Sequence, residues 1–127
     1  SYKDRTKFRL AETYLLLAEA YLRQNMPDKA ADAVNEVRRR AKVADVSDDE
    51  MTMDYLLDER IRELYGEESR RFTLVRTGKL IERVKKYNPE ARDLIQDFHV
   101  LWPIPQAVRD ANTGEFPQNP GYEGYEG

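Results

Sequence analysis

The 127-residue sequence contains no cysteine, and this absence excludes several kinds of chemistry at once. Disulfide bonds, thiol catalysis and cysteine-ligated metal sites all need side chains that these residues do not supply. His99 is the only histidine, so no second imidazole exists for a His-rich metal site or a His-activated nucleophile. A lone histidine beside Phe98 and Trp102 is more often packed than catalytic, and Trp102, between apolar residues and prolines, is itself predicted to be core. We therefore predict that the chain is not an enzyme and holds no cofactor.

The sequence also lacks a long apolar run and a surplus of one charge. Its longest apolar stretch, from Tyr14 to Ala18, is far shorter than the roughly 20 residues that a membrane-spanning helix needs. Lys and Arg number 21 and Asp and Glu 24, a net charge of −3 that argues against a nucleic-acid partner. Charged residues make up 35% of the chain, against roughly 25% in average soluble proteins, which is typical of helix-rich sequences.

Local clusters of charge suggest three other kinds of site, each with a simpler explanation. Arg38–Arg40 and Lys42 form a basic cluster without the interleaved aromatics of a single-strand nucleic-acid surface, and cations suit a helix C-terminus. The acidic residues of 45–50 lack the spacing and central glycine of a calcium loop, so helix capping explains them better. Glu59 and Glu63 have side chains suited to acid–base work, but the arginines around them favour ionised, structural carboxylates.

Residues 8–42 are predicted to form a hairpin of two helices. Apolar residues of the first helix lie on two adjacent stripes, namely Leu10, Tyr14, Leu17 and Tyr21, then Ala11, Leu15, Ala18 and Leu22. Asn25 suits a C-terminal cap, Pro27 cannot continue the helix, and Asp28 can begin the next one. Because the turn is so short, the two helices must lie antiparallel.

The spacing within this hairpin matches the key positions of the tetratricopeptide repeat. The matching residues are Tyr14, Leu17, Ala18, Tyr21, Ala30, Val34 and Val37. Ala18 and Ala30 occupy the places where the paired helices approach closely. Only one copy of the repeat is clear, whereas stable arrays need about three. The hairpin must therefore stack on another element, either later in this chain or outside it.

Residues 47–87 are predicted to hold the remaining regular helices. Ser47 and Glu50 have the spacing of a capping box, which would start a helix running from about Asp48 to Tyr65. A shorter helix is predicted over 67–75, and a further turn or two over 79–86, closed by Asn88-Pro89.

The segment 56–79 concentrates charges of both signs around a narrow apolar stripe. Glu59 and Arg62 lie three residues apart, where helical side chains meet. The segment also contains five arginines: Arg60, Arg62, Arg70, Arg71 and Arg76. Since arginine is the usual cation for partly buried carboxylates, these residues suggest a structural network. A charged, solvent-exposed helix is the alternative.

The C-terminal residues 93–127 change character. The stretch from Phe98 to Pro105 is apolar and extended, because each proline moves its predecessor out of the helical region. Pro105 can open a short helix that runs through Asp110. The remainder, 112–127, is rich in Gly, Pro, Asn and Tyr and is predicted to be loop.

Three motifs in this order resemble the C-terminal part of the SusD/RagB family. The first is the block D-E-R-x-x-E-L-x-x-E followed by R-x-F-x-L-x-R-T-G-K, from Asp58 to Lys79. The second is L-x-P-I-P at 101–105, and the third is Q-N-P-G-Y at 118–122. Glu68 and Thr73 depart from the pattern, since the family usually has Gly and Asp there, and the missing Asp puts one ion pair in doubt. The resemblance extends from Phe8 to Tyr122.

The resemblance implies a scaffold role for a set of signature residues and assigns no ligand contact to this chain. These residues are Glu59, Arg60, Glu63, Glu67, Arg71, Arg76, Gly78, Pro103, Pro105, Asn119 and Pro120. Members of the family are outer-membrane glycan-binding lipoproteins that work with a TonB-dependent transporter. The implied partners are thus a glycan, bound through a missing upstream part, and that transporter. The implied location is the cell surface, reached through a lipid anchor that this cysteine-free chain does not carry.

We therefore predict an all-α fold and a single domain over residues 1–127. It would consist of the hairpin at 8–42, the signature helices at 47–87, and an extended apolar segment and loop tail at 93–127. We expect it to be the C-terminal helical part of a longer glycan-binding protein of polysaccharide uptake. The alternative is a stand-alone tetratricopeptide-like adaptor that binds a peptide or protein partner.

Overall fold

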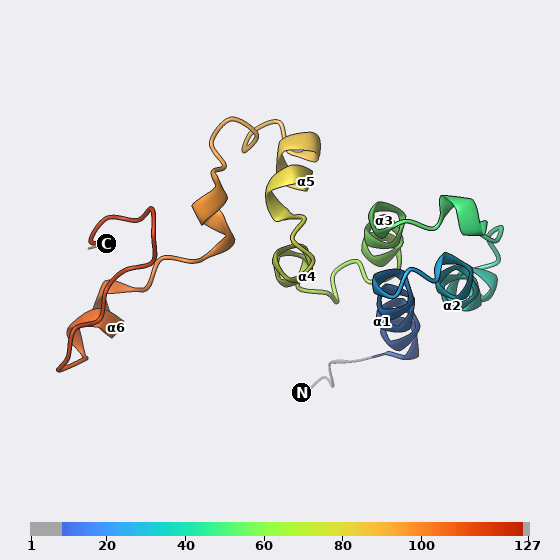
Figure 1. Cartoon of the computed structure of the whole chain (residues 1–127), viewed down its shortest axis with the longest axis horizontal. Coiled ribbons are helices and arrows are strands. Elements are labelled where there is room, and N and C mark those ends of the chain that lie inside the picture. Colours follow the sequence, from blue (N-terminus) through green and yellow to red (C-terminus); the bar gives the residue numbers. More distant parts are fainter. Residues whose placement is uncertain (1–8, 126–127) are drawn as a thin grey trace, which may run out of the picture. The chain divides into compact units, whose positions relative to one another are not determined.

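The computed structural model describes residues 9–125, and all regular secondary structure in that range is helical (Figure 1). The all-α prediction is confirmed. The chain divides into two units, residues 1–69 and 70–127, which we describe separately. Phe8, the predicted start of the hairpin, lies outside the described residues.

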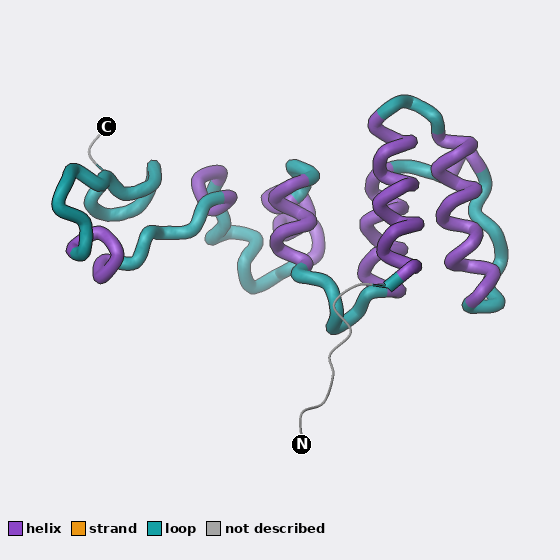
Figure 2. The backbone as a smooth tube through the Cα atoms, turned by 90° about the horizontal axis from the view of Figure 1, so that it is seen from below, coloured by secondary structure: helices purple, strands orange, loops and turns teal. Residues whose placement is uncertain are grey.

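The first unit contains three α-helices, α1 (Leu10–Arg23), α2 (Pro27–Arg40) and α3 (Met53–Glu63). Figures 1 and 2 both show these helices side by side. The α1–α2 turn follows the sequence prediction: Asn25 has a positive φ of 59°, and Pro27 is the first residue of α2. Asn tolerates this left-handed conformation better than most residues, and proline at the first helical position loses no needed hydrogen bond. The tetratricopeptide-like hairpin is therefore present.

The core of this unit lies where the three helices meet. Its most deeply buried side chains are Leu15, Ala18, Ala30, Val34, Leu56 and Leu57. Ala18 and Ala30, the small residues of the repeat pattern, are both fully buried. Burying a Leu or Val side chain contributes about 1.5–3 kcal/mol, so the inner stripe of α1 supplies much of the stability of the hairpin.

Helix α3 begins later than predicted. The predicted capping interaction forms, since the backbone N–H and hydroxyl of Ser47 both donate to Glu50 Oε2, at 3.2 and 2.8 Å. It starts only a single 3-10 turn, η1 (Asp48–Glu50), after which the chain is extended. Thr52 provides the cap of α3 by accepting a hydrogen bond from the backbone N–H of Tyr55. The predicted helix over 48–65 is wrong at its start because a second capping residue follows the first.

The second unit contains short helices joined by long loops, as Figure 2 shows. They are α4 (Arg70–Arg76), α5 (Leu80–Tyr87), the 3-10 turn η2 (Asp97–Val100) and α6 (Gln106–Asp110). Gly66 and Gly78, which precede and follow α4, have φ of 76° and 71° and so favour helix ends. The helix predicted from residue 67 therefore starts only at Arg70, whereas the short helix after Pro105 is confirmed.

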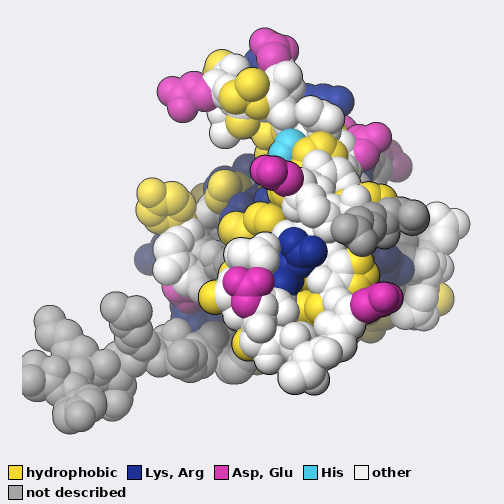
Figure 3. Space-filling model, turned by 90° about the vertical axis from the view of Figure 1, so that its left-hand side faces the viewer, with side chains coloured by type: hydrophobic (Ala, Val, Ile, Leu, Met, Phe, Trp, Pro, Cys, Tyr) yellow, Lys and Arg dark blue, Asp and Glu magenta, His cyan; other side chains and the backbone are white. Residues whose placement is uncertain are grey.

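Few apolar side chains of the second unit are buried. Among its described apolar residues, Leu74 and Leu80 are buried, whereas Phe72, Leu94, Val108 and Phe116 are exposed. Figure 3 shows apolar side chains among charged ones on the face that it presents. Trp102 is 66% exposed, so the prediction that it belongs to the core is wrong. The unit has too few buried apolar residues to cover this ring.

Candidate functional site: a charged network and an open groove

Glu59, the first signature carboxylate, joins α2 to α3. It is 5% exposed, and its Oε2 accepts hydrogen bonds from Arg38 Nη1 at 2.8 Å and from Arg62 Nη2 at 2.6 Å. The predicted Glu59–Arg62 pair is therefore present. Arg38 comes from the preceding helix, and no short-range spacing indicated it. Because two arginines donate to the same oxygen of this buried carboxylate, the side chain is engaged in packing the helices together.

Glu63 forms ion pairs with arginines from both ends of the hairpin. Arg9 Nη1 and Arg40 Nη2 both lie 2.9 Å from Glu63 Oε1, and Arg9 Nη2 also donates to the backbone oxygen of Glu63. Arg9 Nε donates to Glu67 Oε2 at 2.6 Å. The hydrogen bond that Arg9 donates to Glu67, followed by the one that it donates to Glu63, raises the pKa of Arg9. These signature residues thus tie the start of α1 and the end of α2 to the end of α3.

Arg60 is 2% exposed and pairs with Glu68. Its Nε and Nη2 lie 2.7 and 2.6 Å from Glu68 Oε1, and its Nη2 lies 3.8 Å from Glu12 Oε1. Both nitrogens thus meet the same carboxylate oxygen, and hydrogen bonds between two charged groups are among the strong ones in proteins. Glu68 therefore supplies a carboxylate partner for this buried cation.

The signature residues of the second unit lie around the extended segment 101–105. Arg71 donates to the backbone oxygen of His99, and its guanidinium stacks on Trp102, 4.3 Å from the ring centroid. Asn119 Nδ2 donates to the backbone oxygen of Trp102 at 2.8 Å. Gln118 is the first residue of the Q-N-P-G-Y motif but was not among the predicted signature residues, yet its side chain exchanges two hydrogen bonds with the backbone of Ile104.

The remaining signature residues have backbone roles or exposed positions. Pro103 and Pro105 are exposed within the extended segment, and the backbone oxygen of Pro105 accepts from Val108 N as α6 begins. Pro120 is exposed beside Gly121. Arg76 ends α4 and is exposed.

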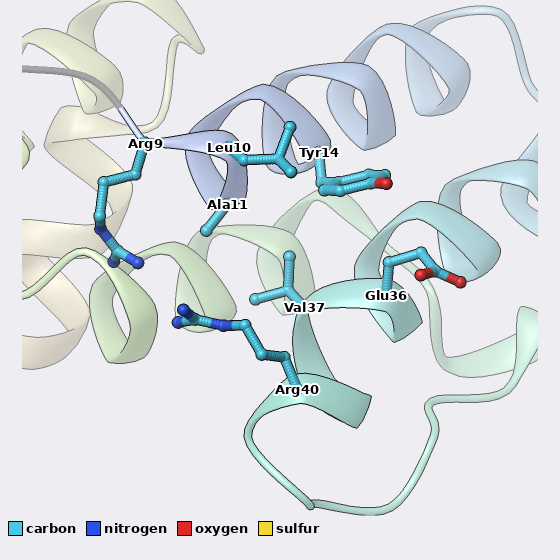
Figure 4. Close-up of a pocket in the computed structure, with 7 residues that line it drawn as sticks. All are labelled: Arg9, Leu10, Ala11, Tyr14, Glu36, Val37 and Arg40. Atoms are coloured by element: carbon cyan, nitrogen blue, oxygen red, sulfur yellow. The ribbon is translucent and has the colours of Figure 1, made fainter.

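An open groove runs along the seam between α1 and α2. One hollow of about 380 Å³ is lined by Arg9, Leu10, Ala11, Tyr14, Glu36, Val37 and Arg40 (Figure 4). A second, of about 260 Å³, is lined by Tyr14, Leu17, Tyr21, Lys29, Asp32, Ala33 and Glu36. The two hollows share Tyr14 and Glu36, so we treat them as one surface, the α1–α2 groove. It has an apolar wall on α1 and a charged rim on α2.

Within residues 9–125, no group of three or more His, Asp or Glu side chains is placed to hold a metal ion. None of the described helices has the length and apolar character that crossing a membrane requires.

Comparison with known proteins identifies a match along nearly the whole chain. The model of the family described as the SusD family matches residues 1–122. The SusD-like protein P25 of Formosa agariphila is 34% identical over 80% of this chain, and the SusD-like protein P38 of the same organism is 32% identical over 76%. The starch-binding protein SusD of Bacteroides thetaiotaomicron is 36% identical over 91%. These matches cover 21%, 20% and 21% of the three relatives, so the chain spans about a fifth of their length. No solved structure matches the chain significantly.

Proposed function

We propose a function for this chain from one premise: it belongs to the SusD family. The chain is the helical scaffold of a surface protein that binds a glycan during polysaccharide uptake. The observation that carries this proposal is the 36% identity, over 91% of the chain, to a relative named as a starch-binding protein. The family resemblance adds a TonB-dependent outer-membrane transporter as partner and a lipid anchor outside these residues.

The contacts of the signature residues support a scaffold role rather than a ligand-binding one. Glu59 and Glu63 lie at the seams between helices, where arginine side chains already donate to their carboxylates, and Arg60 is buried against Glu68. Glycan contacts would therefore come from other parts of the polypeptide.

A glycan titration of two proteins tests this proposal. The 127-residue chain and the longer polypeptide that contains it are titrated calorimetrically with soluble starch and a panel of other polysaccharides. We expect the longer polypeptide to bind at least one glycan and the chain alone to bind none. Binding of equal strength to the chain alone would contradict the scaffold role, and no binding by the longer polypeptide to any of the panel would contradict glycan binding.

The transporter partnership has its own experiment. The tagged longer polypeptide is purified from solubilised outer membranes of its source organism, and the co-purifying proteins are identified by mass spectrometry. A TonB-dependent transporter in stoichiometric amount is the expected result. Purification without one contradicts this part of the proposal.

The α1–α2 groove favours a second candidate, a stand-alone adaptor that binds a peptide in it. A peptide library panned against the 127-residue chain would then yield a consensus whose binding is lost in a Leu17→Glu variant. The scaffold proposal predicts no such consensus.

A further inference from the structure

The 3-10 turn η2 is capped by the imidazole of His99, the only histidine of the chain. The backbone N–H of Gln96, directly before the turn, donates to His99 Nδ1 at 2.8 Å. The backbone N–H of His99 in turn donates to the backbone oxygen of Gln96 at 3.0 Å. A side chain that reaches back to the N–H before its own helix performs half of a capping box, a task that Glu or Gln usually has. His99 therefore closes the turn on which it lies.

The bond from Gln96 to His99 exists in one protonation state only. A neutral imidazole has one nitrogen that accepts and one that donates, whereas a protonated imidazole donates from both. After protonation of His99, the N–H of Gln96 faces a second N–H in place of an acceptor. Histidine is the side chain that gains its proton between about pH 5 and 8. The bond lies at the surface, where protons from the solvent reach it.

The charged groups nearest to the turn are cations. Arg71 of α4 donates to the backbone oxygen of His99, and α5, which packs against η2, contributes Arg83 as its buried charged side chain. The C-terminal loop, residues 112–125, places the ring of Tyr122 edge-on to the imidazole, with 6.2 Å between the ring centroids. The other charged side chains of η2, α5 and this loop, apart from Asp110-adjacent α6, are exposed, namely Asp97, Glu82, Lys85, Lys86, Glu115 and Glu123.

The turn supports Tyr122 through the residues on either side of His99. Phe98 meets the ring of Tyr122 edge-on, with the two centroids 5.0 Å apart. The hydroxyl of Tyr122 donates to the backbone oxygen of Leu101 at 2.9 Å. Gly121 lies so close to Phe98 that a Cβ there would overlap with that side chain. All three contacts depend on the position that η2 gives to Phe98 and to Leu101, the residue that follows the turn.

Two other attachments of the C-terminal loop do not involve η2. The side chain of Gln118 exchanges two hydrogen bonds with the backbone of Ile104. Arg109 Nη2 donates to the backbone oxygen of Gly124 at 3.3 Å. None of these groups changes its charge between about pH 5 and 8. The loop therefore has one attachment that depends on His99, at Tyr122, and two that do not.

We propose that protonation of His99 detaches Tyr122 from η2, so that mild acid loosens the C-terminal loop. The cap needs the neutral ring, so its contribution is present at the upper end of the titration range of imidazole and is lost as the pH falls. Gln118 stays in place in both states. This inference goes beyond the proposed function and does not depend on it.

Backbone NMR relaxation of the 127-residue chain tests this proposal. The order parameters of Tyr122 and Gln118 are measured at about pH 7.5 and about pH 5, where most Asp and Glu side chains remain ionised. We expect the order parameter of Tyr122 to fall from about 0.85 to below about 0.6, the range of flexible backbone. That of Gln118 should stay the same.

Two substitutions of His99 separate the proton from the acceptor. His99→Asn retains an acceptor at the same distance from the Cβ but gains no proton in this range, so Tyr122 should stay rigid at both pH values. His99→Phe retains a ring but has no acceptor, so Tyr122 should be mobile at both. Circular dichroism verifies that each variant keeps its helices.

The amide proton of Gln96 gives a readout that needs no substitution. Its resonance should move upfield as the hydrogen bond is lost, with the same pH midpoint as the order parameter of Tyr122. Different midpoints overturn the proposal, and so does a Tyr122 that is equally rigid at both pH values in the unsubstituted chain. An unchanged acid response in His99→Asn also overturns it, because the effect would then belong to a carboxyl group. A rigid Tyr122 in His99→Phe at about pH 7.5 does the same, because the cap would then not be needed.

Discussion

Asn35 on α2 and Val46 in the following loop are joined by two buried hydrogen bonds. Asn35 Nδ2 donates to the backbone oxygen of Val46 at 3.0 Å, and the backbone N–H of Val46 donates to Asn35 Oδ1 at 2.8 Å. The side chain of Asn35 thus satisfies both the backbone N–H and the backbone C=O of a buried loop residue. In regular secondary structure these groups would be satisfied by other backbone groups. This pair fixes where the chain turns back towards α3.

Replacing Asn35 by Ala should destabilise the first unit by about 1–3 kcal/mol, because two buried backbone groups lose their partners. The measurement is the free energy of unfolding in urea, followed by circular dichroism. Gln24→Ala is the matched control, since its side chain makes one exposed hydrogen bond to the backbone of Ala20. Equal effects of the two substitutions would contradict the importance of the Asn35–Val46 pair.

Replacing Glu63 by Ala should cost about 1.5–3 kcal/mol, because Arg9 and Arg40 lose a shared, charged acceptor. Thermal unfolding gives the measurement. Glu36→Ala is the control: Glu36 pairs with Arg39 where both side chains are more than half exposed, and such pairs contribute less than about 1 kcal/mol. An unchanged melting temperature for Glu63→Ala would contradict the interpretation that these charged residues form a stabilising network.

Replacing Gly121 by Ala should release the C-terminal loop from Phe98. Gly121 has a φ of +87°, and a Cβ there would overlap with the side chain of Phe98. Strain of this kind costs on the order of 1–3 kcal/mol. Limited proteolysis of the region after Gln118 should accelerate in this variant. Gly114→Ala is the control and should not change the cleavage rate, because a Cβ at that position meets nothing within 4 Å. Equally fast cleavage of both variants would contradict the importance of the contact between Gly121 and Phe98.

The capping interaction at Ser47 should be lost in acid. Its hydrogen bonds to Glu50 lower the pKa of that carboxyl, the largest cause being the bond from the Ser47 hydroxyl. A group with a lowered pKa in the folded chain stabilises it above its unfolded pKa, and this contribution disappears as pH falls through the folded value. In an NMR titration, Ser47→Ala should move the pKa of Glu50 back up. An unchanged titration would show that the hydroxyl does not hold the carboxylate.

Periodicity predicted the hairpin because its determinants are local. The spacing of Ala18 and Ala30 placed both at the helix contact, and the Asn-x-Pro sequence placed the turn. Asn35 could not be recognised in this way, since its partner lies 11 residues away in an irregular loop. The exposure of Trp102 could not be predicted from its neighbours in the sequence either, because the burial of a side chain depends on how many apolar residues the rest of the unit supplies.

The charged network could be predicted only in part, for the same reason. Glu59–Arg62 follows from helical spacing, whereas Arg38 reaches its carboxylate from α2 and Arg9 from the position directly before α1. Ser47 and Thr52 carry similar capping signals, and only the packed structure distinguishes the residue that caps the longer helix.

The coding sequence upstream of Ser1 in the source DNA tests the central claim most directly, namely that this chain is the scaffold of a longer surface protein. The account predicts an in-frame extension of several times the length of the present chain, since the chain spans about a fifth of its relatives. That extension should begin with a signal peptide ending in a lipid-accepting cysteine. A start codon directly before Ser1 would contradict the account and identify a free helical module.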